Sequence, residues 1–288
     1  MIHAALMVVS LLASRQERGD TAGGAYSWRE VIPTGTTLEI RGVIGSISAR
    51  AASGKEAQVF ATRTRGHRGD PAQVEIRIIR QPNRIIVCTI YPRDDRWNRN
   101  NDHVEFKDPC EAAQWEKVGR GDNDTRVDYE IQVPAGVHFI GQTVTANVLL
   151  AGLRGDAEGY SIAGDVRVSD VRGGVIDAAS ISGNITFDRV DAADVYAGTL
   201  SGDVHFTGAL RAAGEYSFLS HTGEITVNIP PAAGVTFNVS APKGQVTSSV
   251  PLTPSSHSWR RSSGRQGSGS AGMTLNSLNG EIHIQSLR

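Results

Sequence analysis

The chain has 288 residues, a net charge of −1 at pH 7 and 39% hydrophobic residues, enough for one extended core or two small domains. The balanced charge and the lack of a basic run near aromatic residues exclude the electrostatic footprint of a nucleic-acid-binding protein. No segment reaches the roughly 18 consecutive apolar residues of a membrane-spanning helix, so we expect no transmembrane span in the mature chain.

Residues 1–25 are predicted to be a signal peptide and a linker. The segment Ala4–Ala13 has the length and apolarity of the central region of a signal peptide. The segment before it contains His3 but no Lys or Arg, so a disordered or core-packed N-terminus is the alternative. A signal peptide predicts export to the periplasm, the cell surface or the medium.

Residues 26–142 are predicted to form an N-terminal β-region, which is interrupted by a polar, turn-rich insertion at 92–126. Two cysteines are present, one in a strand-like segment and one in the insertion. In an exported chain such a pair predicts a disulfide, Cys88–Cys110. One buried and one exposed thiol is the alternative. The segments with strand-like alternation are Ala57–Thr62, Val74–Arg80, Arg84–Ile90 and Val127–Val133.

Residues 143–288 contain an internal repeat. Each copy has a small or hydroxyl residue, a glycine, a polar turn residue and two apolar residues separated by a polar one, as in Ser180–Phe187. The best copies have glycines 19, 19, 21 and 21 residues apart, a weaker copy lies near residue 45, and another copy closes the series. A constant period of about 20 residues is typical of a solenoid. The predicted structural turn glycines are Gly45, Gly164, Gly183, Gly202, Gly223, Gly244 and Gly280.

The columns of the repeat predict its local structure. Alternation after the glycine, as in Val166, Arg167 and Val168, indicates a half-buried strand. A second strand precedes the glycine and carries Ser or Thr three residues before it, which predicts an inward ladder of hydroxyls. The glycine is expected to supply a positive φ angle. Two short strands in 19–21 residues make one coil.

The predicted fold class is therefore all-β, a single-stranded β-helix or solenoid of parallel coils with an irregular N-terminal β cap. Such a cap is needed because an open coil leaves an unpaired edge. A β-sandwich is the competing interpretation of many short strands, but the near-constant step favours the solenoid. Residues 252–272 have low complexity and are predicted to be a flexible loop, which explains the 36-residue step from Gly244 to Gly280.

Acidic and amide side chains follow the repeat glycines, and aligned carboxylates could in principle bind Ca²⁺. One such residue per coil is too few, so we expect these side chains to stabilise turns. Asp122–Asp124 with Asp128 resembles half of a calcium loop but lacks its glycine. The histidines are dispersed and lack a zinc spacing. We expect no metal and no cofactor. The column consists of Asp165, Asn184, Asp203 and Glu224.

Several segments resemble the bacterial putative-adhesin family with β-strand repeats and unknown function. They are Trp28–Ala49, Val87–Pro92, the Ser-Gly-Asp repeats and Leu278–Ile284. The resemblance extends from about residue 28 to residue 288. It implies a β-solenoid, and it carries no catalytic residues over to this chain. The chain departs from the family pattern at Ile44 and Ala146, where repeat turns more often have Asn and Gly.

We therefore predict an exported, non-catalytic protein whose repetitive polar surface serves adhesion or envelope binding. The candidate binding face is the outward column Arg167, Thr186, His205 and Thr226. A polysaccharide or an envelope protein is the expected partner. The alternative is a polysaccharide lyase or hydrolase, because β-helices also carry such enzymes. Those sites need clustered acids and bases on adjacent coils, whereas the acids of this sequence fall in turns.

Overall fold

The computed structural model describes residues 17–18, 25–92, 110, 123–250, 253–258 and 261–287. Most of residues 1–25, predicted to be a signal peptide and a linker, and most of the predicted insertion 92–126 lie outside these residues. The described part consists of strands, turns and one short 3-10 helix, η1 (Pro71–Gln73), so the all-β prediction is confirmed. Within these residues no helix is long and apolar enough to cross a membrane.

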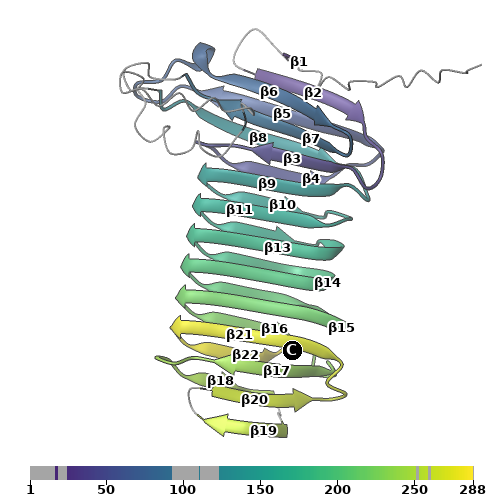
Figure 1. The fold of residues 1–288 in the computed structure, drawn as a ribbon, viewed down its shortest axis with the longest axis vertical. Coiled ribbons are helices and arrows are strands. Elements are labelled where there is room, and N and C mark those ends of the chain that lie inside the picture. Colours follow the sequence, from purple (N-terminus) through teal and green to yellow (C-terminus); the bar gives the residue numbers. More distant parts are fainter. Residues whose placement is uncertain are drawn as a thin grey trace, which may run out of the picture.

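The strands form one large mixed sheet that winds around a common core (Figure 1). In chain order they are β1 (Glu17–Arg18), β2 (Ala25–Val31), β3 (Thr37–Arg41), β4 (Ile47–Ala51), β5 (Glu56–Thr64), β6 (Glu75–Gln81), β7 (Arg84–Ile90), β8 (Arg126–Val133), β9 (His138–Thr145), β10 (Val148–Ala151), β11 (Ala157–Ala163), β12 (Val166–Ser169), β13 (Arg172–Ser182), β14 (Ile185–Ser201), β15 (Val204–Thr222), β16 (Ile225–Ile229), β17 (Val235–Ser240), β18 (Val246–Ser248), β19 (Thr253–Ser258), β20 (Arg261–Gln266), β21 (Ala271–Asn279) and β22 (Ile282–Ser286).

Most of the strands pair in parallel along two ladders. The first ladder contains the strands before the repeat glycines, in the order β7, β3, β9, β11, β13, β14, β15, β21 and β17. The second contains the strands after them, in the order β8, β4, β10, β12, β14, β15, β16, β22 and β18. We call the two strand segments on either side of one glycine a rung.

The rungs do not stack in chain order at either end of the molecule. The β3–β4 rung lies between β7–β8 and β9–β10. The β21–β22 rung likewise lies between β15–β16 and β17–β18. The predicted sequential order of the last copies is therefore wrong, because Gly280 occupies the rung between Gly223 and Gly244. The first and the last copy of the repeat therefore each form the second rung from an end of the stack, and not the outermost one.

Antiparallel strands cover the two ends of the stack (Figure 1). At one end β6 pairs with β7, and β5 joins β2 to β8. At the other end β20 pairs with both β17 and β19. The prediction of a loop over 252–272 is therefore wrong for the segments that form β19, β20 and the start of β21. These pairings replace the open parallel edge of the first ladder at both ends, which limits edge-to-edge association. The second ladder is covered in this way only beside β8, because the three-residue strand β18 pairs in parallel with β22 alone among the described strands. Strand β9 also crosses the boundary predicted at residue 143.

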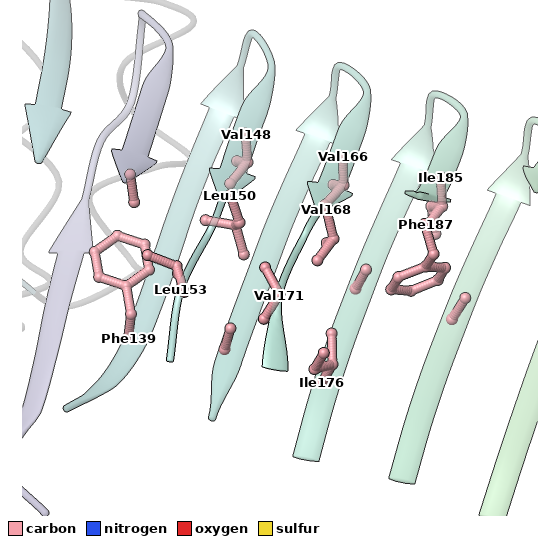
Figure 2. Close-up of a cluster of buried hydrophobic side chains, with 14 of the residues drawn as sticks. Phe139, Val148, Leu150, Leu153, Val166, Val168, Val171, Ile176, Ile185 and Phe187 are labelled. Carbon is pink, nitrogen blue, oxygen red and sulfur yellow. The ribbon is translucent and has the colours of Figure 1, made fainter. Parts of the chain in front are cut away.

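The core is a continuous column of apolar side chains between the ladders. Val148, Val166 and Ile185 lie at equivalent positions on successive rungs and point inward (Figure 2). At the next inward position two phenylalanines, Phe187 and Phe206, lie between Val168 and Val227 on successive rungs. There the ring of Phe206 lies 5.1 Å from that of Phe218, centroid to centroid. The predicted alternation of buried and polar residues is confirmed along these strands.

The repeat glycines are required chiefly because the rungs approach closely at this corner. A Cβ atom on Gly183 would lie 2.1 Å from the carbonyl oxygen of Gly164, and one on Gly202 would lie 2.1 Å from that of Gly183. All seven predicted glycines face such a backbone oxygen or carbon within 2.1 Å. A φ angle in the left-handed region, as predicted, is found at three of the seven, so it is not the shared reason. The three are Gly45, Gly202 and Gly223.

The predicted hydroxyl ladder is present and satisfies the glycine carbonyls. Each Ser or Thr three residues before a repeat glycine donates to the carbonyl at the glycine position of the preceding rung, as Ser180 does to Gly164 at 2.9 Å. Because this carbonyl is covered by the next rung, an unpaired oxygen here would cost about 1–3 kcal/mol. The donors are Thr143, Ser161, Ser180, Thr199, Ser220 and Ser277.

Cys88 of β7 forms a disulfide with Cys110. The two sulfurs belong to a small apolar cluster with Ile86, outside the main core. Arg41 of β3 donates to the carbonyl of Cys110 at 2.8 Å. The bond therefore holds residue 110 against the outer face of the first ladder.

Candidate functional site

The four residues of the predicted binding face lie in register on four consecutive rungs. Arg167 of β12 pairs with Thr186 of β14, which pairs with His205 of β15, and His205 pairs with Thr226 of β16. All four side chains point outward, and Arg167 and His205 are exposed. We call this outward column of the second ladder the polar column.

The polar column is longer than the sequence analysis predicted. Thr226 pairs with His283 of β22, and His283 pairs with Thr247 of β18. The hydroxyl of Thr247 lies 2.6 Å from Nδ1 of His283. These two residues are neighbours only because β22 inserts before β18. Thr247 and His283 each lie three residues after a repeat glycine, as His205 does, so the sequence placed both in the same outward column. The contact between them was missed because the copies were expected to stack in chain order.

A second group of polar atoms lies beside His205. The amide nitrogen of Asn228 is 3.2 Å from His205 Nε2 and 3.2 Å from the hydroxyl of Thr207. Adjacent strands are about 4.8 Å apart, so hydrogen-bonding groups recur at this spacing along the surface. Such a surface can bind an extended chain that carries hydroxyl or amide groups at regular intervals.

The acidic and amide column after the glycines stabilises turns, as predicted. Oδ1 of Asp165 accepts from the backbone N–H of Asn184, and Oδ1 of Asn184 accepts from that of Asp203, both at 2.8 Å. Asp203 accepts from Glu224 in the same way at 2.8 Å. Each side chain therefore binds the corresponding amide of the next rung. Among the described residues no three His, Cys, Asp or Glu side chains are placed to hold a metal ion.

The carboxylates that resemble half of a calcium loop hold two loops in place. Asp124 accepts from the backbone N–H groups of Arg68 and His67, at 3.0 and 2.8 Å, and these bonds lower its pKa. Asp128 accepts from both the amide and the hydroxyl of Ser46. Because these oxygens already accept hydrogen bonds, their geometry supports structural roles.

The first ladder carries a titratable cluster that sequence reasoning missed. Nε2 of His138 lies 2.8 Å from Glu158 on the next rung. The hydroxyl of Tyr160 donates to Glu158 at 2.7 Å and to Asp177 at 2.9 Å. All four side chains are half-buried on the outer face of β9, β11 and β13. The outward positions of the first ladder show no residue type that recurs from copy to copy. The only signal in the sequence was the separation of 20 residues between His138 and Glu158, which is one repeat length.

This cluster shifts the pKa values of its carboxyl groups in opposite directions. The hydrogen bond with His138 lowers the pKa of Glu158 and raises that of His138. Burial raises the pKa of Asp177, although Tyr160 donates to it. Burial and the bond to Glu158 raise the pKa of Tyr160. The cluster therefore combines a stabilised carboxylate with a carboxyl group that holds its proton to higher pH.

Stability is expected to fall at alkaline pH because of His138. Because the pKa of His138 is raised in the folded state, protonated His138 contributes to the free energy of unfolding. This contribution is complete below the pKa of the unfolded state, about 6.5, and is lost as pH rises through the pKa of the folded state. The lowered pKa of Glu158 adds a contribution that is lost only in acid. As pH rises from about 6 to 8.5, the free energy of unfolding measured in urea should fall by up to about 1 kcal/mol more for the wild type than for His138→Gln. Equal losses in the two proteins would contradict this prediction.

One more carboxylate on the first ladder is completely buried. Glu39 of β3 accepts from Arg41 at 2.6 Å and from Arg84 at 2.6 Å, and the amide of Gln142 donates to it at 2.9 Å. A buried charge is tolerated only when it is paired and hydrogen-bonded. Glu39 therefore joins β7, β3 and β9, and its geometry indicates a structural role.

Residues 153–285 match the family model named Toastrack DUF4097. Two solved structures are similar over most of the chain. A putative cell adhesion protein from Clostridium sporogenes is 11% identical, with a TM-score of 0.37, and the match covers 91% of this chain and 100% of that one. A putative adhesin from Bacteroides fragilis is 11% identical, with a TM-score of 0.36 and coverage of 90% and 97%. No curated protein matches the chain. Residues 153–285, somewhat less than half of the chain, are thus similar to the Toastrack family, and the resemblance to the putative-adhesin family of unknown function is confirmed.

Proposed function

We propose that the protein is an exported β-solenoid of stacked parallel coils that binds an extended polar polymer, a polysaccharide of the cell envelope, along the polar column. The observation that carries the proposal is the register of Arg167, Thr186, His205 and Thr226 on consecutive rungs. A periodic ligand can repeat the same contacts from rung to rung, so several weak hydrogen bonds add up without a deep pocket. An envelope protein with an extended segment is the other partner that such a surface fits.

Two observations support the remaining parts of this proposal. The parallel pairing of β12, β14, β15 and β16 at intervals of 19–21 residues fits coils of one chain wound about an axis. The Cys88–Cys110 disulfide fits an oxidising compartment, because such bonds rarely persist in the cytosol. We further propose that residues 1–25 direct export and that residues 26–142 cap the solenoid of residues 143–288.

A non-catalytic role fits the carboxylates beside the polar column. Asp165 and Asp203 each accept a hydrogen bond from a backbone amide of the next rung through one carboxylate oxygen. This contact favours a role in stabilising the turn over a role in proton transfer. A glycan-cleaving enzyme is the second candidate. The observation that favours it is the pair Glu158 and Asp177, whose pKa values move apart, as in glycosidases. Release of reducing ends from envelope glycans, abolished by Glu158→Gln, would support the enzyme.

The binding proposal is tested by reversing the charge of the polar column. Arg167→Glu with His205→Glu is expected to weaken binding to the best ligand of a bacterial glycan array by about tenfold or more, since two hydrogen-bonding contacts are lost. The measurement is the dissociation constant by calorimetry. The matched control is Arg172→Glu with Ala209→Glu, which makes similar changes at two exposed positions away from the polar column. Unchanged binding in the first variant, or an equal loss in the control, would refute the site.

A further inference from the structure

One half of the polar column has side chains that already bind one another or their neighbours. The hydroxyl of Thr226 donates to Glu224 at 2.6 Å, and Nε2 of His283 lies 3.4 Å from Glu281. Nδ1 of His283 contacts the hydroxyl of Thr247. The polar groups of this half are therefore engaged in contacts within the protein.

The other half of the polar column has groups that are available to a ligand. Arg167 is exposed and Thr186 is half-buried, and neither side chain has a hydrogen bond or ion pair with another described residue. His205 contacts Thr207 and Asn228 through Nε2 alone. Because the amide nitrogen of Asn228 donates to Nε2, the proton of the neutral imidazole is on Nδ1. His205 can therefore donate this proton to a ligand.

A carboxylate lies beside each of the two nitrogen-bearing side chains. Asp165 precedes Arg167 by two residues, and Asp203 precedes His205 by two, so the members of each pair are about 6.6 Å apart on one face. Each aspartate holds its turn through Oδ1, which leaves Oδ2 as an acceptor. The rung between them has no charged side chain at these two positions. The first and third rungs therefore each offer an acceptor beside a donor.

One amide group of a ligand can satisfy both members of such a pair. The N–H and the C=O of a trans amide point in opposite directions. The N–H can therefore donate to Asp165 while the C=O accepts from Arg167. The pair of Asp203 and His205 can bind a second amide in the same orientation.

The spacing of the two pairs favours a polysaccharide over an extended protein segment. The pairs are two rungs apart, about 9.6 Å. In an extended β-1,4-linked polysaccharide successive sugars are turned over, so equivalent groups recur on one side at every second sugar, and one sugar is about as long as one rung spacing. An extended peptide repeats each side about every 6.6 Å. A peptide that follows the column would therefore lose register within a few rungs.

The charges beside the polar column favour a neutral ligand. An acidic polymer would be repelled by the carboxylates that follow the glycines of these rungs. A polymer of amines would bind these carboxylates, but it would place its charge against Arg167 and offer that residue no acceptor. A neutral amide avoids both conflicts. The carboxylates are those of Asp165, Asp203, Glu224 and Glu281.

We propose that the ligand of the polar column is a β-1,4-linked chain of N-acylated amino sugars, and that Asp165, Arg167, Asp203 and His205 bind the amide groups of every second sugar. This inference rests on the proposed function, because it specifies the polymer that the column binds. Thr186 lies between the two pairs and binds a hydroxyl of the intervening sugar.

Calorimetry with three hexasaccharides of the same linkage tests the ligand class. The hexamer of N-acetylglucosamine should bind about tenfold or more tightly than the hexamer of glucose, which has hydroxyls in place of the two amides. The hexamer of glucosamine, which has amines there, should also bind more weakly. Equal or tighter binding of either control, or no binding of the N-acetylglucosamine hexamer, would overturn the proposal.

Asp165→Asn with Asp203→Asn tests the assigned acceptors. Asparagine keeps the Oδ1 atom that holds the turn, as Asn184 does in the rung between, but its NH₂ group cannot accept from an amide. Binding of the N-acetylglucosamine hexamer should weaken by about tenfold or more, with a melting temperature close to that of the wild type. The control is Glu281→Gln, at a carboxylate that already contacts His283, and it should bind like the wild type. Unchanged binding in the double variant would refute the assignment.

Arg167→Glu with His205→Glu separates this inference from the proposed function. If the N-acetylglucosamine hexamer binds and this variant binds it equally well, the polar column is not the site and both proposals fail. If the hexamer does not bind but this variant loses another glycan of the array, the polar column remains a binding site. That result overturns the assignment of the amide groups alone.

Discussion

Replacement of Gly183 by alanine is expected to lower the free energy of unfolding by about 4 kcal/mol, near the upper end for a single substitution. The added Cβ atom would lie 2.1 Å from the carbonyl oxygen of Gly164. That oxygen also accepts from Ser180, so it cannot move away without breaking this bond. The two rungs must therefore separate, and parallel pairing is lost on both ladders. Urea unfolding followed by circular dichroism measures the effect.

Gly198→Ala is the matched control, because it makes the same chemical change in the neighbouring rung where no atom lies within 4 Å. Its effect should stay within about 0.5 kcal/mol of zero. Comparable losses in the two variants would mean that backbone entropy, and not the close approach of the rungs, explains the glycine column. Each rung contacts only its neighbours, so unfolding need not be two-state. Amide hydrogen exchange should therefore show that protection is lost first in β13 and β14.

Replacement of Phe206 by alanine is expected to cost about 3–5 kcal/mol. Its ring is fully buried and lies among three other rings, with centroids 6.2 Å from Phe187, 5.8 Å from Tyr216 and 5.1 Å from Phe218. Removing it leaves a cavity in the axial core, and the rungs on either side cannot close over it because their backbones are held at the strand spacing.

Phe206→Leu is the companion variant, since a smaller change in volume should cost less than about 1.5 kcal/mol. Both variants are compared by urea unfolding at one protein concentration, which keeps any association constant. A loss of less than 1 kcal/mol in Phe206→Ala would show that the aromatic rings contribute little beyond filling space, and that the neighbouring rungs relax into the cavity.

The two outer faces of the ladders differ in a way that bears on function. The polar column on the second ladder carries Arg167 and His205 beside the acidic turn column, so it suits a polar ligand. The first ladder carries the cluster of His138, Glu158, Tyr160 and Asp177, whose polar atoms already bind one another.

The repeat could be predicted from the sequence because every rung repeats the same close contacts. The hydroxyl of Ser180 and the glycine at 183 satisfy requirements set by the adjacent rung, so their residue types recur at a fixed spacing. Outward residues have no such requirement. The contact between His138 and Glu158 therefore left no recurring pattern, although the two residues are 20 apart, one repeat length.

The sequence by itself determined the strands that flank the repeat glycines, their inward faces, the turn glycines and the outward register of Arg167 through Thr226. These features depend on interactions between neighbouring rungs, which leave a periodic pattern in the chain. Only the tertiary structure decided that β3–β4 and β21–β22 insert one rung from the ends and that antiparallel strands cover those ends. The reason is that all rungs offer nearly the same interface. Ile225 can pair with Ile282 as well as with Val246, because both are apolar and lie two residues after a repeat glycine. The periodic pattern therefore fixes the register between any two adjacent rungs, but it does not decide which rungs are adjacent.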